Sequence, residues 1–280
     1  MDTISTPSKP IIVGYDGSDG SQRAVRWAAR HAAATGSSLL VVHCWAWPLF
    51  TSNLGPVTGM EDSGLRNDAE RIASEGSDLA AHTAPDIAVS QRLITGFPAE
   101  VMTKLSAEAS LLVTGTRGLG GFSGLLIGSV SLHLAASASC PVAVVREEQP
   151  SPDRILVAVD GSPESDRAVL TAADLAKALS QSLHLLHALP DRRHLAEEMP
   201  DAERDPIIQQ SLNLLPHNTN LTVADESISA GSVPGAIIER ASAAACVVLG
   251  AKGRNTLGAR LGSTVHAVLH HSKGNVIVVR

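Results

Sequence analysis

The chain has 280 residues, which suits one large domain or two of ordinary size, because domains most often run to roughly 100–150 residues. Hydrophobic residues make up 44% of it, charged residues 18% and aromatic residues 2%, so the composition predicts a globular protein with an aliphatic core. A formal net charge of −6 and the absence of a long apolar run exclude general attraction to nucleic acid and insertion into a membrane.

Short apolar stretches alternate with helical patterns along the first half of the chain. Strands are predicted over residues 11–13, 39–44, 87–94, 111–114 and 142–145. Helices are predicted over residues 61–82, 99–108 and 130–139, and around the apolar positions Ala24, Val25, Ala28, Ala29 and Ala32. Short continuous apolar strands that alternate with helices are typical of a parallel sheet covered on both faces.

The second half of the chain repeats the first. Residues 11–45 align without a gap on residues 155–189, so that Asp16 matches Asp160 and His43 matches His187. The match resumes where residues 115–118, GTRG, meet residues 250–253, GAKG. We therefore predict two domains, residues 1–147 and 154–280, joined by a polar, proline-containing linker at residues 148–153.

A glycine-rich loop, GTRGLGGFSGLLIGS, follows the predicted strand 111–114 and leads into a predicted helix. Ligands of open parallel sheets bind at the carboxyl ends of the strands, and a helix N-terminus there favours an anion. Glycines let the backbone approach a phosphate, and the Ser129 and Ser131 hydroxyls add donors. The sequence therefore predicts a ligand that carries phosphate, although neither the P-loop pattern nor the dinucleotide fingerprint G-x-G-x-x-G is present.

Several motifs together resemble those of the universal stress proteins. Gly115, Gly118 and Gly128–Ser129 follow the pattern G-x-x-G, nine residues, G-[ST], which is similar to the ATP-binding signature of that family. The D-G-S after the first strand and the V-V-H near the end of the second also look like the family, and the tandem arrangement is similar to its two-domain mycobacterial members. The resemblance implies a doubly wound, five-stranded parallel α/β domain in each half, with strand order 3-2-1-4-5, of the nucleotide-binding α-hydrolase-like or HUP type.

The resemblance also implies ATP with Mg²⁺ as the ligand. Gly14 and Asp16 are expected against the adenosine, and the main chain at Cys44 at the adenine edge. The residues expected around the ribose and the α-phosphate are Gly115, Thr116, Arg117, Gly118, Gly120 and Gly121. Those expected at the outer phosphates are Gly128, Ser129, Val130 and Ser131. The matching positions in the second half are Ala158, Asp160, Ala188, Gly250, Gly253, Gly262, Ser263, Thr264 and Val265.

The second half departs from the pattern. Eight residues, not nine, separate Gly253 from Gly262, and Ala158 stands where the first half has Gly14. A shorter loop must either move the helix N-terminus or pull the glycines away from the phosphates. We therefore expect the second site to be weaker than the first or altered.

Some of these residues have a second interpretation that needs no ligand. Asp16 and Asp160 stand where they would cap the first helix of their half. His43 and His187 are expected to be buried histidines bonded to the main chain, because no carboxylate or nucleophile in the sequence is matched to them. No spacing is typical of a metal site, so no metal ligand and no catalytic residue is predicted.

The sequence predicts a binding protein, not a metabolic enzyme. The expected function is that of an ATP-binding, nucleotide-responsive regulator of stress adaptation, acting as a homodimer with an unidentified protein partner. Two alternatives stay open: a slow ATPase or phosphotransferase, and a dimerisation module with a degenerate second nucleotide site. A cytoplasmic location is expected, because the N-terminus lacks a signal-peptide pattern and Cys44, Cys140 and Cys246 read as buried thiols.

Overall fold

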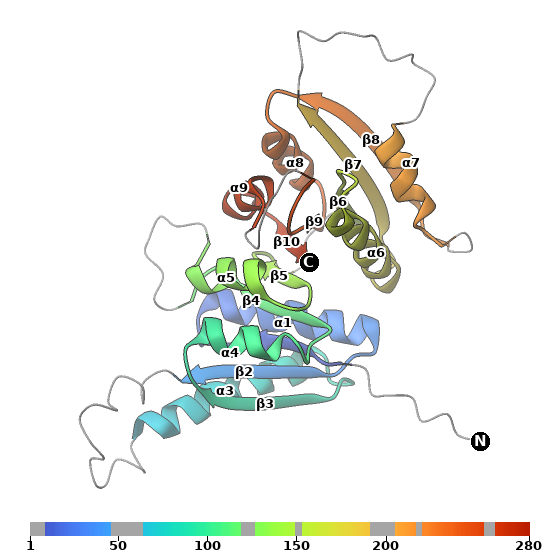
Figure 1. The fold of residues 1–280 in the computed structure, drawn as a ribbon. Coiled ribbons are helices and arrows are strands. Elements are labelled where there is room, and N and C mark those ends of the chain that lie inside the picture. The colour runs from blue at the N-terminus through green and yellow to red at the C-terminus, as the bar shows by residue number, and fades with distance from the viewer. Residues whose placement is uncertain are drawn as a thin grey trace. The chain divides into compact units, whose positions relative to one another are not determined.

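Two compact units make up the chain, Met1–Glu148 and Gln149–Arg280. The computed structural model describes residues 9–45, 64–118, 127–148, 153–190, 205–216, 220–254 and 261–280. Figure 1 labels the elements of both units, and each unit is described below by itself. Among the described helices, none combines the length and the apolar character that crossing a membrane requires.

The first unit contains five parallel strands. They are β1 (Ile11–Gly14), β2 (Leu39–Trp45), β3 (Val89–Thr95), β4 (Leu111–Gly115) and β5 (Val142–Val145). The strands lie side by side in the order β3-β2-β1-β4-β5, and all four neighbouring pairs are parallel. This confirms the predicted strand order, with β1 at the centre. From β1 the chain adds β2 and β3 on one side and then crosses over to add β4 and β5 on the other, so the strand order reverses between β1 and β4.

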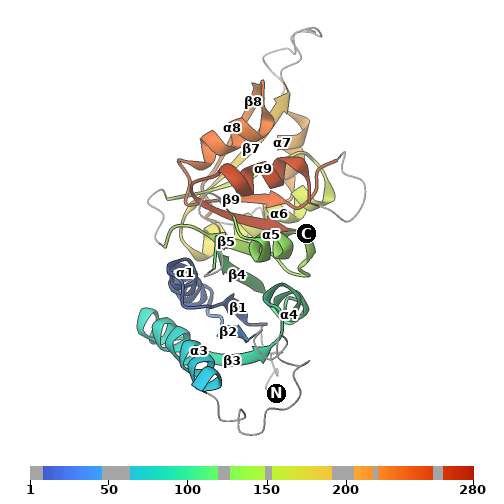
Figure 2. The same cartoon turned by 90° about the vertical axis from the view of Figure 1, so that its left-hand side faces the viewer.

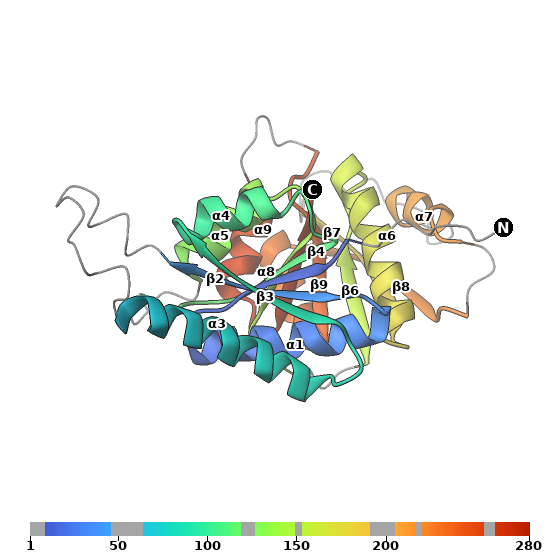
Figure 3. The same ribbon diagram turned by 90° about the horizontal axis from the view of Figure 1, so that it is seen from below.

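Helices cover both faces of this sheet. They are α1 (Asp19–Thr35), α3 (Gly64–Thr83), α4 (Pro98–Leu105) and α5 (Ser129–Ser137). Figures 2 and 3 show α1 and α3 on one face and α4 on the other, and α5 contacts α4. Because both faces are covered, Ile11, Ile12 and Leu112 of the central strands are at most 1% exposed.

Several predicted bounds were wrong by one to three residues, among them the end of the helix predicted over 130–139, which stops at Ser137, and two of the differences have a clear physical reason. The third strand begins at Val89, not at residue 87, because Ile87 still donates its N–H to the carbonyl of Ala84 in a turn. Helix α4 ends at Leu105, not at residue 108, because the next residues turn back on themselves: Glu108 donates to the Leu105 carbonyl three residues earlier, at 2.9 Å.

The second unit repeats this arrangement. Its strands are β6 (Arg154–Ala158), β7 (Ser182–Pro190), β8 (Val223–Ala230), β9 (Cys246–Gly250) and β10 (Asn275–Val279), in the parallel order β8-β7-β6-β9-β10. Its helices are α6 (Pro163–Ala178), α7 (Pro206–Asn213), α8 (Val233–Ala241) and α9 (Ser263–His271). Figure 1 shows α6 and α7 on one face and α8 and α9 on the other. Helix α7 has 8 residues where its counterpart α3 has 20, and this is the largest difference between the described parts of the units.

Helix α1 forms ion pairs with Glu148, the last residue of the first unit. Arg30 donates to the Glu148 carboxylate at 2.7 Å, and Arg26 lies 3.5 Å from the same carboxylate. Exposed ion pairs of this kind contribute roughly 0–1 kcal/mol each. Their effect is therefore to orient Glu148 against α1 more than to stabilise the fold.

Candidate functional site

A cavity of about 390 Å³ opens at the carboxyl ends of β1, β2 and β4 in the first unit. Its volume falls in the range of small-molecule sites, roughly 300–1,000 Å³. The residues that line it come from the β1–α1 turn, the end of β2, helices α3 and α4, and the segment from β4 to α5. They are Gly14, Tyr15, Asp16, Ser21, Val42, His43, Cys44, Ile72, Pro98, Met102, Thr114, Gly115, Arg117, Gly118, Gly128, Ser129, Val130, Ser131 and Leu134.

Asp16 organises the turn between β1 and α1. Its Oδ1 accepts hydrogen bonds from the backbone N–H of Ser18 at 3.1 Å and from the Ser18 hydroxyl at 2.6 Å. Ser18 is itself the N-cap of α1, and its Oγ accepts from the N–H of Ser21. Asp16 therefore supports the N-cap residue, Ser18, from a position two residues earlier in the chain. This differs from the expectation that Asp16 caps the helix directly.

The loop that leaves β4 lies directly on the first turn of α1. A Cβ atom added to Gly115 would stand 2.6 Å from the backbone carbon and oxygen of Gly20, and one added to Gly20 would stand 2.7 Å from the Arg117 carbonyl oxygen. Neither backbone can yield, so both residues must be glycine. Gly115 thus makes room for another part of the protein, a contact that sequence reasoning missed because it depends on Gly20 across the fold.

Helix α5 begins at the edge of the cavity. Gly128 is its N-cap, and its N–H donates to the Thr116 carbonyl at 2.6 Å. Ser131, which is 3% exposed, donates its hydroxyl hydrogen to the Gly115 carbonyl at 2.8 Å. The Ser131 hydrogen therefore fixes the helix to the end of β4, whereas the first backbone N–H groups of α5 have no capping side chain among the described residues.

His43 and Tyr15, which both line the cavity, are held by hydrogen bonds. The Nδ1 of His43 donates to the Tyr15 carbonyl at 2.8 Å, which confirms the expected bond to the main chain. The Tyr15 hydroxyl donates to Glu75 of α3 at 2.8 Å, and burial together with this carboxylate raises the pKa of Tyr15 well above its ordinary value. Burial also raises the pKa of the Cys44 thiol to about 12, so this thiol stays protonated at neutral pH.

Most of the residues predicted for the first site do line this cavity. Those brought together are Gly14, Asp16, Cys44, Gly115, Arg117, Gly118, Gly128, Ser129, Val130 and Ser131. Thr116 contributes its carbonyl to α5, and Gly120 and Gly121 lie outside the described residues. Sequence reasoning missed the apolar lining from α3 and α4, Ile72, Pro98 and Met102. No local motif marks these residues, because only the docking of the helices brings them to the edge of the sheet.

Comparison with known proteins follows the same tandem division. The family model described as the universal stress protein family matches residues 7–146 and again residues 152–280. A universal stress protein of Mycobacterium tuberculosis is 31% identical over 299 aligned residues that cover 99% of both chains. A second one from that organism is 30% identical over 303 residues, covering 96% of this chain and 94% of the relative.

The chain belongs to the universal stress protein family. The fold agrees with this assignment: a crystal structure of a universal stress protein from Archaeoglobus fulgidus superposes with a TM-score of 0.73 at 20% identity, covering 98% of each chain.

In the second unit of this universal stress protein, the predicted residues occupy the equivalent places. Ala158 ends β6, Ala188 lies in β7 and Gly250 ends β9. Gly262 is the N-cap of α9 and donates its N–H to the Ala251 carbonyl at 2.9 Å, the same bond that Gly128 makes in the first unit. The first turn of α9 contains Ser263, Thr264 and Val265. The shorter loop has therefore not moved the helix from its anchor on the preceding strand.

The turn after β6 is more crowded than its counterpart in the first unit. The Asp160 carboxylate accepts from the backbone N–H of Ser162 at 3.0 Å and from that of Arg254 at 3.1 Å. A Cβ atom on Gly161 would stand 2.6 Å from the Cδ1 of Ile207 and 3.1 Å from a guanidinium nitrogen of Arg254. Two side chains thus cover this turn.

His187 is buried, as expected, at 8% exposed, but the expected bond to the main chain was wrong. Its Nδ1 lies 2.6 Å from the Oδ2 of Asp205, the N-cap of α7, and not against the main chain. The Ser227 hydroxyl donates to the same oxygen at 2.6 Å. Burial raises the pKa of Asp205, but the hydrogen bonds from Ser227 and His187 outweigh it, so the pKa lies below its ordinary value. The partner was not apparent in the sequence, since Asp205 follows His187 by 18 residues and comes from the next helix.

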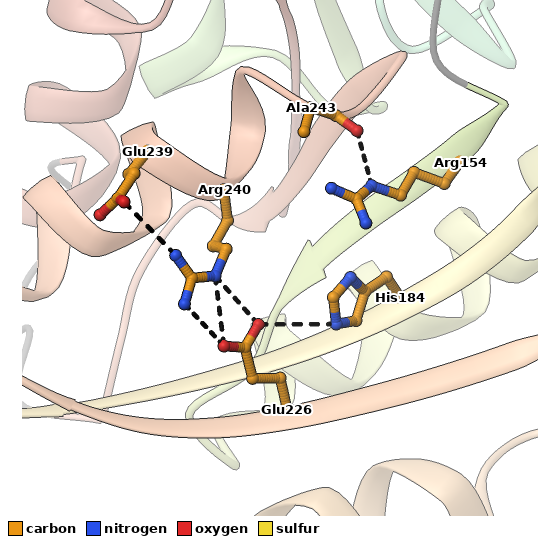
Figure 4. A network of polar contacts seen from close by, with 6 residues as sticks. All are labelled: Arg154, His184, Glu226, Glu239, Arg240 and Ala243. Carbon is orange, nitrogen blue, oxygen red and sulfur yellow. Dashed lines mark hydrogen bonds and ion pairs between the residues drawn. The ribbon is translucent and has the colours of Figure 1, made fainter.

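A second polar cluster in this unit lies away from the carboxyl edge of the sheet (Figure 4). Glu226 of β8 accepts from Arg240 of α8 at 2.7 Å and 3.0 Å, and its carboxylate lies 3.8 Å from His184. Arg154 donates to the Ala243 carbonyl at 2.6 Å. His184 is the third residue of β7 and Arg154 the first of β6, so the cluster sits toward the amino ends of these strands. It fastens α8 to the sheet.

This cluster predicts a pH dependence of stability. The hydrogen bond from Arg240 lowers the pKa of Glu226 from its ordinary 4.5. A carboxylate whose pKa is lowered by folding stabilises the fold above its ordinary pKa and loses that effect as the pH falls. We expect Glu226→Gln to be less stable than the parent at pH 7, by an amount that shrinks below pH 4.5. Urea unfolding of both proteins from pH 7 to pH 3 measures this difference. An undiminished gap at pH 3 would show that the carboxylate charge is not its origin.

Among the described residues, no group of three or more histidine, cysteine, aspartate or glutamate side chains is placed to hold a metal ion. In the first cavity of this universal stress protein, the described acidic side chain of the lining is Asp16 and the described basic one is Arg117.

Proposed function

We propose that the first unit binds ATP in the cavity beside α5, and that the protein acts as a nucleotide-responsive regulator of stress adaptation. The observation that carries this proposal is the composition of the cavity. Its lining combines an apolar part, from β2, α3 and α4, with a part that suits anions, the N-terminus of α5 with Arg117. A ligand with a flat apolar group and a polyanionic tail suits both parts.

Each part of the ligand has a partner of matching chemistry. Val42, Ile72 and Met102 provide apolar contact for a purine base. The uncapped N–H groups of α5, with the positive end of its dipole, and the Arg117 guanidinium favour phosphate oxygens. Asp16 is already bonded to Ser18, so we propose that Mg²⁺ enters with the phosphates and is held by them and by water. The role of the ion is to neutralise charge on the triphosphate.

Regulation by ATP requires that the nucleotide bind one state of the protein more tightly than another. The loop between Gly118 and α5 connects β4 to the helix N-terminus, and its two anchors are the contact of Gly115 with Gly20 and the bond of Gly128 to Thr116. Binding of phosphate at the first turn of α5, beside these anchors, is the change that we propose a partner protein detects. We assign no catalytic residue. The alternative function, a slow ATPase, is tested by the experiment below.

The deciding experiment is to denature the purified protein and to identify any released nucleotide by chromatography and mass spectrometry. Recovered intact ATP supports the proposal. Recovered ADP, with slow turnover when ATP is added back, favours the ATPase. If no nucleotide is released and calorimetric titration detects no binding of ATP, the proposal is wrong and the dimerisation module is favoured.

We further propose that the protein is a cytoplasmic homodimer. All three cysteines are free, and Cys140 and Cys246 are buried, as expected for a protein in a reducing compartment. Light scattering coupled to size exclusion, with and without ATP, measures the oligomeric state and its dependence on the nucleotide.

A further inference from the structure

Helix α7 is fixed to the second unit at its first turn. Asp205 accepts two hydrogen bonds at 2.6 Å, from Ser227 of β8 and from His187 of β7, through the same oxygen. Its other oxygen accepts from the backbone N–H of Ile207 at 2.8 Å. The side chains of Asp205 and His187 are 12% and 10% exposed, so the bond between them is largely shielded from water, whereas the bond from Ser227 is exposed. One carboxylate therefore joins two strands to the beginning of a helix.

A second contact fixes the orientation of the same helix. Gln210, one turn further along α7, donates to the Asp166 carboxylate of α6 at 3.1 Å and 3.2 Å. This pair is exposed, so it contributes less than the bonds of Asp205. The two contacts together hold α7 against α6 and the ends of β7 and β8.

This position places Ile207 on the turn that follows β6. The Cδ1 of Ile207 lies 2.6 Å from where a Gly161 Cβ would be, and the Arg254 guanidinium lies next to it. In the first unit, no heavy atom of the described residues, which leave out 46–63, lies within 4 Å of the corresponding Cβ position on Gly17. The two glycines have similar conformations, with φ of +73° and +83°, so the difference comes from what covers the turn.

His43 near the end of β2 and His187 near the end of β7, which are equivalent residues, also differ in what they contact. His43 lines the first cavity and bonds to the carbonyl of Tyr15 in its own sheet. His187 instead bonds to the carboxylate of Asp205, which α7 brings to it. In the second unit, both the histidine and the turn are therefore engaged by the first turn of α7.

We propose that His187, Asp205 and Ser227 form a latch that holds α7 over the second nucleotide site and keeps ATP out of it. This inference rests on the proposed function, because it assumes that an uncovered site of this fold binds ATP. With the latch closed, Ile207 and Arg254 occupy the approach to Asp160, and the protein binds one ATP per chain. Admitting a second ATP requires α7 to lift, which breaks the bonds of Asp205.

The experiment counts ATP molecules per chain by calorimetric titration of the full-length protein with Mg²⁺-ATP. The parent protein is expected to bind one. Asp205→Ala combined with Ile207→Ala removes the latch and the side chain it positions, and is expected to bind two. Gln210→Ala is the matched control, since it frees α7 from α6 but leaves the latch intact, and it is expected to bind one. Circular dichroism and hydrogen exchange verify that each variant is folded and that only the latch variant exposes α7.

Adding Gly118→Ala to the latch variant isolates the second site. This triple variant is expected to bind one ATP at the second site in addition to the weakened first site, whereas Gly118→Ala alone shows the weakened first site only. A parent protein that binds two overturns the latch and leaves the proposed function intact. Latch variants that are folded but gain no ATP also overturn the latch. A parent protein that binds none overturns the proposed function, and the gain of binding in the latch variant is then the separate test of the latch.

Discussion

Gly118→Ala is expected to weaken ATP binding by about tenfold or more, and Gly253→Ala to leave it unchanged. A Cβ atom on Gly118 would collide with the Oδ2 of Asp16, so either the loop must withdraw or the carboxylate must leave Ser18. Both movements disturb the cavity, because Gly118 and Asp16 line it. A tenfold loss corresponds to about 1.4 kcal/mol, which is comparable to the loss of a single charge-assisted hydrogen bond.

Gly253→Ala is a matched control because its Cβ atom would also meet the carboxylate of an aspartate. Its Cβ atom would stand 2.6 Å from the Oδ2 of Asp160, the counterpart of Asp16. The two substitutions therefore impose similar costs on their own units, and the comparison separates nucleotide binding from stability. Calorimetric titration with ATP and thermal unfolding of both variants supply the measurements. Equal loss of binding in the two variants would contradict the assignment of ATP to the first unit, as would unchanged binding in Gly118→Ala.

Gly76→Ala is expected to lower the free energy of unfolding by up to about 2 kcal/mol, the balance of an overpacking cost of roughly 1–3 kcal/mol and a gain in helix propensity of about 1 kcal/mol. Gly76 lies within α3, where a Cβ atom would stand 2.6 Å from the Tyr15 ring and 2.9 Å from Val41. The ring cannot move aside, since Tyr15 is 2% exposed and its hydroxyl is bonded to Glu75. A glycine lowers the helix propensity at this position, but the Tyr15 ring, which lines the cavity, fits only because residue 76 has no side chain.

Two further variants make this prediction specific. Gly64→Ala changes another glycine of the same helix, and no heavy atom of the described residues lies within 4 Å of its Cβ position, so stability is expected to be unchanged or slightly higher. Tyr15→Val, which introduces the residue found at the equivalent Val159, removes the ring and is expected to relieve the cost of Gly76→Ala in the double variant. Urea unfolding at pH 7 compares the parent protein with the three single variants and the double variant. Additive losses in the double variant would refute the steric explanation.

The local rules of the chain accounted for most of the fold. The predicted strand 142–145 coincides with β5, and the alternation of buried strands and helices correctly indicated a parallel sheet, whereas its strand order agrees with the one that the family resemblance implied. Errors occurred at the ends of elements, where local turns and hydrogen bonds across the fold decide the last residue. Ser106, for example, accepts from the N–H of Ser139 at 2.8 Å just where α4 stops short of its predicted end.

The candidate site divides in the same manner. Glycine spacing and the D-G-S turn located Asp16, Gly118 and Gly128 at one cavity, since each follows a strand whose carboxyl end lies at the same edge of the sheet. Ile72 and Met102 could not be found this way, because a residue on an amphipathic helix reads as core whether it faces a cavity or not.

By itself, the sequence determined the tandem repeat, the parallel sheets and the edge at which a ligand would bind, because these follow from periodicity and from motifs at the ends of strands. Only the tertiary structure decided that Gly115 yields space to Gly20 and that His187 meets Asp205. The halves align closely through residues 11–45 and 155–189, yet α3 and α7 differ in length and dock differently. The difference between the two sites arises from that docking, since a contact across the fold depends on where each helix lies and not on the residues beside it in the chain.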